Sequence, residues 1–332
     1  MNTHDAPEGH EEHTPLPLPV NSPDRRDGQV YVMTAELRMA VKVALATGRP
    51  LLLRGEPGSG KSSLAAYVAR EHDWRYYEYV VTSRSKAEDL LWTYDHVRRL
   101  SDAQVRDPGT VLNDADYVTP GPLWWAYNPA TAADGRKGRR KRKDPWARIN
   151  KDRAPDHAVV LIDEIDKADP DLPNSLLVPL GSHQFTVTDT GERVRRQKGA
   201  ERGGRKGHTA AGQHLIIITT NEERELPQAF LRRCVVMELP EPDRERLVDI
   251  AAEHFRHEHG GTEGFDQELA EALARELLDA RKEARATDVR PPSTAEFLDA
   301  LRACTSLGIG VTHDDWWLIR SLTLLKPQQP EA

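Results

Sequence analysis

Cysteine is nearly absent from this 332-residue sequence, and long apolar runs are missing. Cys234 and Cys304 lie far apart and lack CxxC spacing, which argues against a disulfide framework and against a zinc site. No stretch approaches the roughly twenty apolar residues that a membrane span needs. The first residues show no basic start followed by an apolar stretch, so they do not resemble a secretory signal. We therefore expect a cytoplasmic protein without a membrane segment and without a bound transition metal.

Positive charge is concentrated in two segments, although the formal net charge is −7. Residues 135–151, GRKGRRKRKDPWARINK, contain nine Lys or Arg and one acid, and a second basic stretch runs from Arg193 to Gly207. Such runs can bind nucleic-acid phosphates in a salt-sensitive way. Only Trp146 offers an aromatic ring for base stacking in them. We favour a solvated basic insertion at about 130–156, and nucleic-acid binding remains an alternative.

Short apolar runs alternate with helix-compatible segments in the first two thirds of the chain. Residues 1–28 precede them and show no apolar periodicity, which predicts a disordered leader. The alternation predicts an α/β domain over residues 29–239, with a parallel sheet and helices on both faces. The expected strands are Leu51–Leu53, Tyr79–Thr82, Ala158–Ile162, His214–Thr219 and Val235–Leu239.

Strand signals stop after Pro240, and helical periodicity replaces them. Apolar residues recur at helical spacing along two segments, and Ser293 with Glu296 forms a capping box before a third. This pattern predicts a small all-helical domain over residues 240–332. We expect Trp316 and Trp317 to anchor this domain.

The strongest chemical signal is the pattern GxxxxGK[ST] at residues 55–62, set between an apolar strand and a helix. Glycines let successive backbone N–H groups surround phosphates at the start of the helix. Lys61 is expected to reach the β- and γ-phosphates and the Ser62 hydroxyl to hold Mg²⁺. ATP is the expected nucleotide, with GTP as an alternative because the loop contacts phosphates and not the base. The predicted site comprises Gly55, Glu56, Pro57, Gly58, Ser59, Gly60, Lys61, Ser62 and Ser63.

Acidic and polar residues follow two later strands. Asp163 and Glu164 end an apolar run, where Asp163 fits a magnesium ligand and Glu164 fits the base that polarises an attacking water. Asn221 follows the next strand and can position that water. Arg232 and Arg233 precede a further strand, and either would stabilise transition-state charge if it reached the nucleotide of a neighbouring subunit.

With these features in this order, the chain resembles the AAA+ ATPases, and among them the MoxR-type branch of the dynein-related AAA subgroup. The segments HQFTVTDTGERV, TTNEERELPQAFLRRC and PPSTAEFLDAL add to the resemblance. It implies a hexameric ring with ATP at each subunit interface, Arg232 or Arg233 acting in trans, a protein client and a von Willebrand A domain partner. The chain departs from the family where Ser293 and Thr294 stand in place of a lid arginine that senses the γ-phosphate; Arg290 is nearby.

The favoured function is an ATP-driven motor that remodels or activates a protein client. A nucleotide-gated scaffold with slow turnover and a nucleic-acid remodeler that uses the basic insertion are the alternatives. The aromatic stretch with Trp124, Trp125 and Tyr127 is expected to pack inside the fold rather than to grip a substrate.

Overall fold

The computed structural model describes residues 28–325, except 106–110, 135–140, 198–212 and 288. The predicted disordered leader lies outside the described residues apart from residue 28. Parts of both basic stretches lie outside them as well. Within the described residues, no helix combines the length and the apolar character that crossing a bilayer requires.

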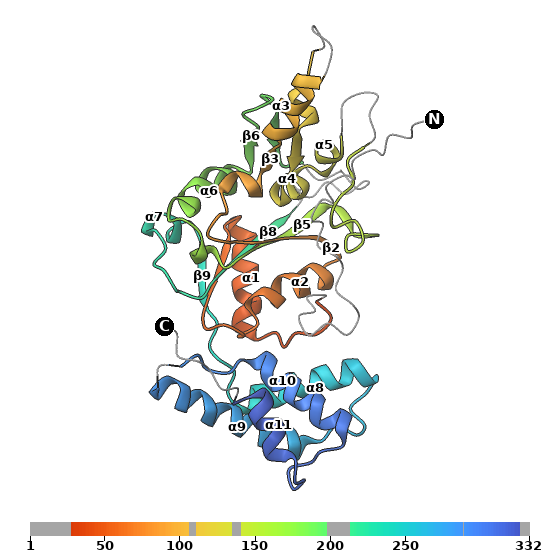
Figure 1. Ribbon diagram of the computed structural model, residues 1–332, viewed down its shortest axis with the longest axis vertical. Coiled ribbons are helices and arrows are strands. Elements are labelled where there is room, and N and C mark those ends of the chain that lie inside the picture. Colours follow the sequence, from red (N-terminus) through yellow and green to blue (C-terminus); the bar gives the residue numbers. More distant parts are fainter. Residues whose placement is uncertain (1–27, 106–110, 135–140, 198–212, 288, 326–332) are drawn as a thin grey trace, which may run out of the picture.

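A parallel sheet forms the centre of the described structure, with strand order β2-β5-β8-β1-β9 (Figure 1). All four neighbouring pairs in it are parallel, as the alternating pattern predicts. Strand β2 spans Trp74–Val80, whereas the sequence predicted a strand over Tyr79–Thr82. The predicted start was too late because Arg75 and Glu78 interrupt the apolar residues of this strand. The strands are β1 (Leu51–Arg54), β2 (Trp74–Val80), β5 (Ala154–Asp163), β8 (His214–Thr220) and β9 (Val235–Glu238).

Helices cover both faces of this sheet, because alternate strand residues point to opposite sides. Leu51 and Leu53 pack with α1 and α2 on one face, whereas Leu52 packs into the core on the other. That second core includes Trp124, Trp125 and Tyr127, so the aromatic stretch is interior packing, as expected. The covering helices are α1 (Ala35–Thr47) and α2 (Lys61–Glu71) on the first face, and η1 (Ala87–Leu90), α4 (Pro122–Tyr127) and α6 (Asp171–Ser182) on the second.

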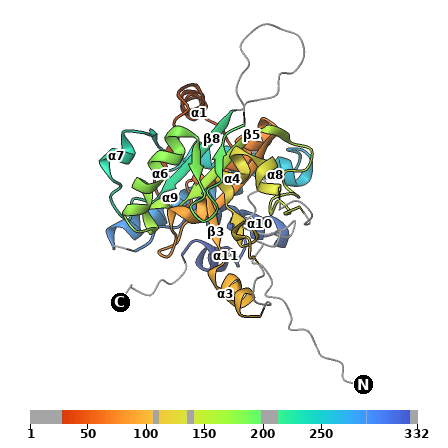
Figure 2. The ribbon, with the colours of Figure 1, turned by 90° about the horizontal axis from the view of Figure 1, so that it is seen from above.

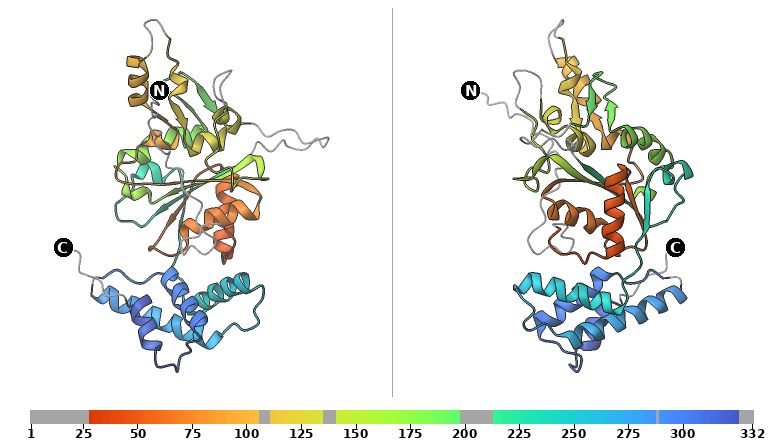
Figure 3. Two further views of the ribbon diagram at one scale, coloured as in Figure 1. Left: turned by 45° about the vertical axis from the view of Figure 1, so that its right-hand side comes forward. Right: turned by 180° about the vertical axis from the view of Figure 1, so that it is seen from behind.

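Two small antiparallel hairpins stand above the second face, on the side away from the C-terminal helices (Figure 3). One pairs β3 (Trp92–Tyr94) with β4 (Val118–Pro120), and the other pairs β6 (Gln184–Thr186) with β7 (Arg193–Arg195). Trp92 joins them, since its indole Nε1 donates to Asp189 Oδ2 at 2.8 Å and its ring stacks on Phe185. The remaining short elements are η2 (Asp114–Asp116), α5 (Pro129–Ala133), η3 (Ile165–Lys167) and α7 (Gln228–Leu231).

Helix α3 (His96–Val105) belongs to the first hairpin and stands out from the body of the molecule in Figure 2. None of its residues is buried. It is therefore held mainly by polar contacts, such as the ion pair between Arg99 and Asp114.

Four C-terminal helices form a separate layer with a core of their own, the lid (Figures 1 and 3). Ser293 and Glu296 make the expected capping box at the start of α10, with Ser293 N donating to Glu296 Oε2 at 2.7 Å. Trp316 packs against the lid core, but Trp317 is 65% exposed, so the prediction that both anchor the lid is wrong for Trp317. It lies on the outer face of its helix. The lid helices are α8 (Arg244–His259), α9 (Gln267–Ala286), α10 (Thr294–Leu307) and α11 (Trp316–Thr323).

Replacing Leu161 by Ala should lower the free energy of unfolding by about 2–5 kcal/mol, because the side chain is fully buried in the middle of β5 and would leave a cavity. Urea titration followed by circular dichroism measures this. Leu307→Ala is the control, since Leu307 is 65% exposed at the end of α10, and its effect should stay within about 0.5 kcal/mol. Equal losses in the two variants would contradict the assigned core.

Candidate active site

The loop between β1 and α2 is a glycine turn that leaves no room for a side chain at Gly55 or Gly58. Gly55 has φ 138°, and a Cβ there would lie 2.6 Å from the Leu239 carbonyl oxygen. Gly58 has φ 79°, in the left-handed region that favours glycine. The helix that follows begins at Lys61. The loop is therefore free to present backbone N–H groups at a helix N-terminus, which is how proteins bind phosphate groups.

Lys61 lies inside the curve of this loop, and its side chain is nearly buried. Its Nζ donates to the carbonyl oxygens of Gly55, at 2.6 Å, and Glu56, at 2.8 Å. Burial lowers the pKa of Lys61, and the nearby Asp163 carboxylate opposes that shift. The Lys61 ammonium is thus held inside the glycine loop.

The start of α2 and the carboxyl ends of β5 and β8 meet at the Asp163 carboxylate. Both the Ser62 hydroxyl and the Thr219 hydroxyl donate to Asp163 Oδ1, each at 2.6 Å. Asp163 is only 2% exposed. A hydroxyl and a carboxylate at this distance suit Mg²⁺, which takes oxygen ligands and completes its shell with water and substrate phosphates. Ser62 and Asp163 therefore fit the magnesium role predicted for them.

Glu164 follows directly and has an unusual backbone, with φ 59° and ψ 51°. Its N–H donates to the Thr219 hydroxyl at 2.8 Å, which holds this left-handed turn. Its carboxylate accepts from Lys167 Nζ at 2.8 Å and from Asn221 Nδ2 at 3.4 Å. The hydrogen bond with Glu164 raises the pKa of Lys167. The structure thus brings the predicted base and the predicted water-positioning Asn221 together.

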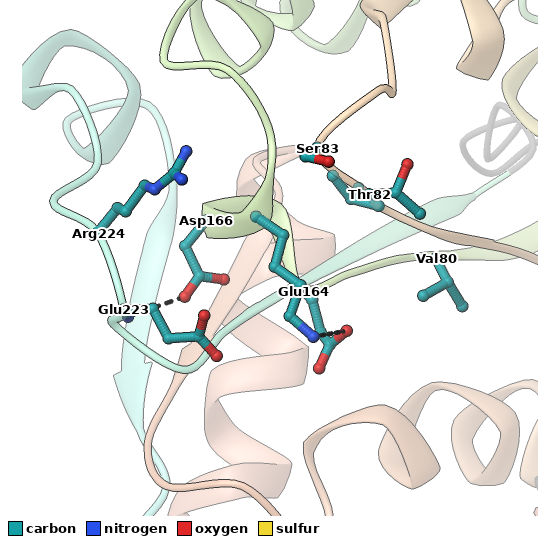
Figure 4. A pocket seen from close by; sticks show the side chains of 9 residues that line it. Val80, Thr82, Ser83, Glu164, Asp166, Glu223 and Arg224 are labelled. Atoms are coloured by element: carbon teal, nitrogen blue, oxygen red, sulfur yellow. Dashed lines mark hydrogen bonds and ion pairs between the residues drawn. The ribbon is translucent and has the colours of Figure 1, made fainter. Parts of the chain in front are cut away.

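A pocket of about 390 Å³ opens beside Glu164 (Figure 4). Thr82 and Ser83 line one part of it, and Arg224 extends over another. Arg224 also donates to the Ala168 carbonyl oxygen at 3.4 Å. The pocket leaves one side of the Glu164 carboxylate open to a small molecule such as water.

Three contributors to the site were absent from the sequence-based prediction: Thr219, Lys167 and Asp166. Thr219 is one of two adjacent threonines in an apolar strand, and nothing in the sequence marks its hydroxyl as a link between two acids. Lys167 and Asp166 belong to the segment DEIDKAD, which is dense in charge, so only their contacts identify them. Asp166 accepts from two backbone N–H groups after β8.

Arg232 and Arg233 do not join this cluster within one chain. They follow α7 beside the edge strand β9, and both are exposed. Arg233 Nη1 donates to the Ala229 carbonyl oxygen at 2.9 Å, and the Arg232 carbonyl oxygen accepts from Arg49 at 3.1 Å. Both side chains therefore lie on the surface beside β9, away from the Asp163 and Glu164 carboxylates.

The lid reaches the glycine loop through the first turn of α10. A Cβ added to Gly58 would lie 2.4 Å from Ser293 Cβ, so the two backbones are in close contact. The buried Arg281 supports this turn, donating to the Pro292 carbonyl oxygen at 2.9 Å and to Thr294 Oγ1 at 3.3 Å. Arg290 is exposed. The lid thus presents Ser293 to the glycine loop.

Comparison with known proteins gives a family for this arrangement. Residues 50–234, more than half of the chain, match the AAA domain (dynein-related subfamily). Two solved structures of RuvB variants from Thermotoga maritima are similar at 12% and 13% identity, with TM-scores of 0.43 and 0.44. In each case 86% of this chain and 67% of that chain are covered. TM-scores below 0.5 are too low to support a shared function. No curated protein matches the chain.

Replacing Thr219 by Val should lower the free energy of unfolding by about 1–3 kcal/mol, because the buried Asp163 loses a donor and the Glu164 N–H loses its acceptor. Chemical denaturation measures the change. Thr119→Val is the matched control, since Thr119 is an exposed residue of the short strand β4. A Thr219→Val protein as stable as the parent would show that this hydroxyl does not hold the two acids.

Proposed function

The chain belongs to the dynein-related subfamily of AAA domains, and from that premise we propose that it is an Mg²⁺-dependent ATPase that remodels or activates a protein client within an oligomeric ring. The family match confirms the resemblance and the α/β fold class predicted from the sequence. An AAA domain implies ATP binding and ATPase activity. The residue roles, the client and the ring are the proposal.

One observation carries the residue roles. Ser62 donates to Asp163, and the Thr219 hydroxyl links Asp163 to the Glu164 N–H, so the three residues belong to one hydrogen-bonded group at the start of α2. Lys61 lies in the adjoining loop. The residues proposed for phosphate binding, metal binding and water activation therefore lie at one edge of the sheet, which supports these roles.

Each residue has a distinct task in this proposal. The backbone N–H groups of residues 55–63, other than Pro57, and the Lys61 ammonium bind the phosphates, and Ser62 with Asp163 holds Mg²⁺. The metal ion neutralises phosphate charge when it is bound. Glu164 accepts a proton from, or orients, the attacking water, and Asn221 fixes the position of that carboxylate and of the water.

The division into parts follows from the same argument. We assign nucleotide binding to residues 29–239 and the role of moving lid to residues 240–332, because Ser293 of the lid touches the glycine loop at Gly58. A change in the loop on hydrolysis would then move the lid. A protein partner such as a von Willebrand A domain fits the family-based expectation.

A ring follows from the place of the arginines. The transition state of phosphate transfer to water carries negative charge on the phosphate oxygens, which an arginine can stabilise together with Lys61. Arg232 and Arg233 are exposed at the β9 edge of the same molecule. A neighbouring copy can supply either of them in trans, which closes a ring if the contact repeats. A hexamer is the proposed size.

A scaffold with slow turnover is the second candidate. It is favoured by the ion pair between Glu164 and Lys167 at 2.8 Å, because the Lys167 ammonium occupies one oxygen of the carboxylate that would act on the water. Ser293 in place of a lid arginine also favours slow turnover. The nucleic-acid alternative rests on the basic insertion, and residues 135–140 of it lie outside the described part of the chain.

Lys61→Ala should abolish detectable ATP binding, because it removes the buried charge that faces the phosphates. Glu164→Gln should retain binding and lower steady-state phosphate release by at least about 100-fold, as expected for loss of a general base. Calorimetry and a phosphate-release assay measure these effects, with EDTA as the metal-free condition. Lys42→Ala is the control, since Lys42 is exposed on α1. Parent-like activity in both variants would overturn the assigned roles.

Arg233→Ala or Arg232→Ala should lower the turnover of the assembled protein by about 10³-fold or more, because the transition state loses a charge supplied in trans. Mixing the inactive arginine variant with Lys61→Ala should restore part of the activity, since one chain then brings the intact glycine loop and the other the intact arginine. Arg38→Ala, exposed on α1, is the control. Mixed assemblies without recovered activity would refute action in trans for that arginine.

A further inference from the structure

Asp166 is a buried carboxylate that the roles above leave unused. It lies in η3, two residues after Glu164, and is 2% exposed. Its Oδ2 accepts from the backbone N–H of Asn221 at 3.2 Å and of Glu223 at 3.0 Å. Its Oδ1 is buried and has no hydrogen-bond partner among the described residues. Figure 4 shows the side chain turned toward the loop that carries Glu223.

The loop after β8 obtains its hydrogen bonds from side chains. Strand β8 pairs with β5 as far as Ile218 and with β1 as far as Thr220. The backbone N–H groups after Thr220 therefore lie outside the sheet. The N–H of Glu222 donates to the Thr220 hydroxyl at 3.0 Å, and those on either side of it donate to Asp166. Three successive N–H groups are thus accepted by two side chains, around a left-handed residue, Glu222, with φ 62°.

This arrangement decides where the Asn221 amide lies. The Asn221 N–H is bound to Asp166, and its Nδ2 lies 3.4 Å from Glu164 Oε1. Asp166 and Glu164 are both held by the turn that ends β5. The segment after β5 therefore carries both Glu164, the proposed base, and Asp166, which holds the backbone of Asn221 after β8.

The cost of burial supports a specific role. An ionised carboxylate with one oxygen lacking a partner is expensive to bury, whereas an apolar residue could fill the same space at lower cost. A hydrogen bond to a charged acceptor is about twice as strong as one between neutral groups. A charge at this position therefore holds the Asn221 backbone more tightly than a neutral acceptor would.

We propose that Asp166 is a positioning residue for ATP hydrolysis, which acts by holding Asn221 against the Glu164 carboxylate. The inference rests on the proposed ATPase function. Asp166 acts on the catalytic step through Asn221, so ATP binding does not depend on it. Loss of Asp166 and loss of Asn221 are then two ways of removing the same interaction.

A double-mutant cycle tests this coupling. Asp166→Ala and Asn221→Ala should each lower kcat at least about tenfold, with KM for ATP changed less than about threefold. The double variant should be no more than about twofold slower than Asn221→Ala alone. Asp166→Asn should recover part of the activity, since its amide oxygen can accept both N–H groups but carries no full charge. Asp169→Ala, an exposed neighbour that accepts from Asp171 N, should behave like the parent.

The outcomes separate this inference from the function on which it rests. If the two losses multiply, or if Asp166→Ala raises KM and leaves kcat unchanged, Asp166 does not act through Asn221, and the ATPase assignment stands. If the parent chain does not hydrolyse ATP, the proposed function fails first. Should Asp166→Ala not fold, as shown by its thermal melt, the cycle with Asp166→Ser replaces it. Serine keeps a small polar group that is too short to accept both N–H groups, so the same coupling is expected.

Discussion

The hydrogen bonds that converge on Asp163 are the interaction on which the rest of this protein depends. A buried carboxylate is costly unless donors surround it, and here Ser62 and Thr219 both donate to one oxygen at 2.6 Å. Ser62 lies in the first turn of α2, Asp163 ends β5 and Thr219 lies near the end of β8. The contact therefore joins three segments that are far apart in the sequence, and it brings the glycine loop to the acids.

The parallel sheet makes that convergence possible. In a parallel sheet, the carboxyl ends of neighbouring strands lie at the same edge, and ligands bind there. Strand β1 lies next to β8, and β8 lies next to β5, so the glycine loop and the acids of β5 are two strands apart. Thr219 on the strand between them bridges that gap.

The lid and the hairpins extend from this centre in opposite directions. The lid contacts the glycine loop through Ser293, which lies against Gly58. The hairpins lie on the other side of the sheet, where α6 leads from the turn at Glu164 to β6. The hydrogen bond from Trp92 to Asp189 joins the two hairpins. The turn that carries the acids thus leads to the hairpins, whereas the glycine loop contacts the lid.

Sequence alone determined the fold class and the glycine loop, and it singled out Asp163 and Glu164, because these features follow from local rules. Backbone approach to phosphates demands glycines, and apolar runs before the acids indicate buried strands. The same local reasoning predicted the α10 capping box, which depends on residues three apart.

Only the tertiary structure revealed Thr219, Lys167 and Asp166 as parts of the site, since their importance lies in contacts made across strands or around a left-handed turn. It also showed that Trp317 is exposed, because the sequence cannot tell which side of the short helix α11 faces the lid core. It placed Arg232 and Arg233 on the surface, because the residues between α7 and β9 lie beside the edge strand of the sheet, where their side chains are left exposed.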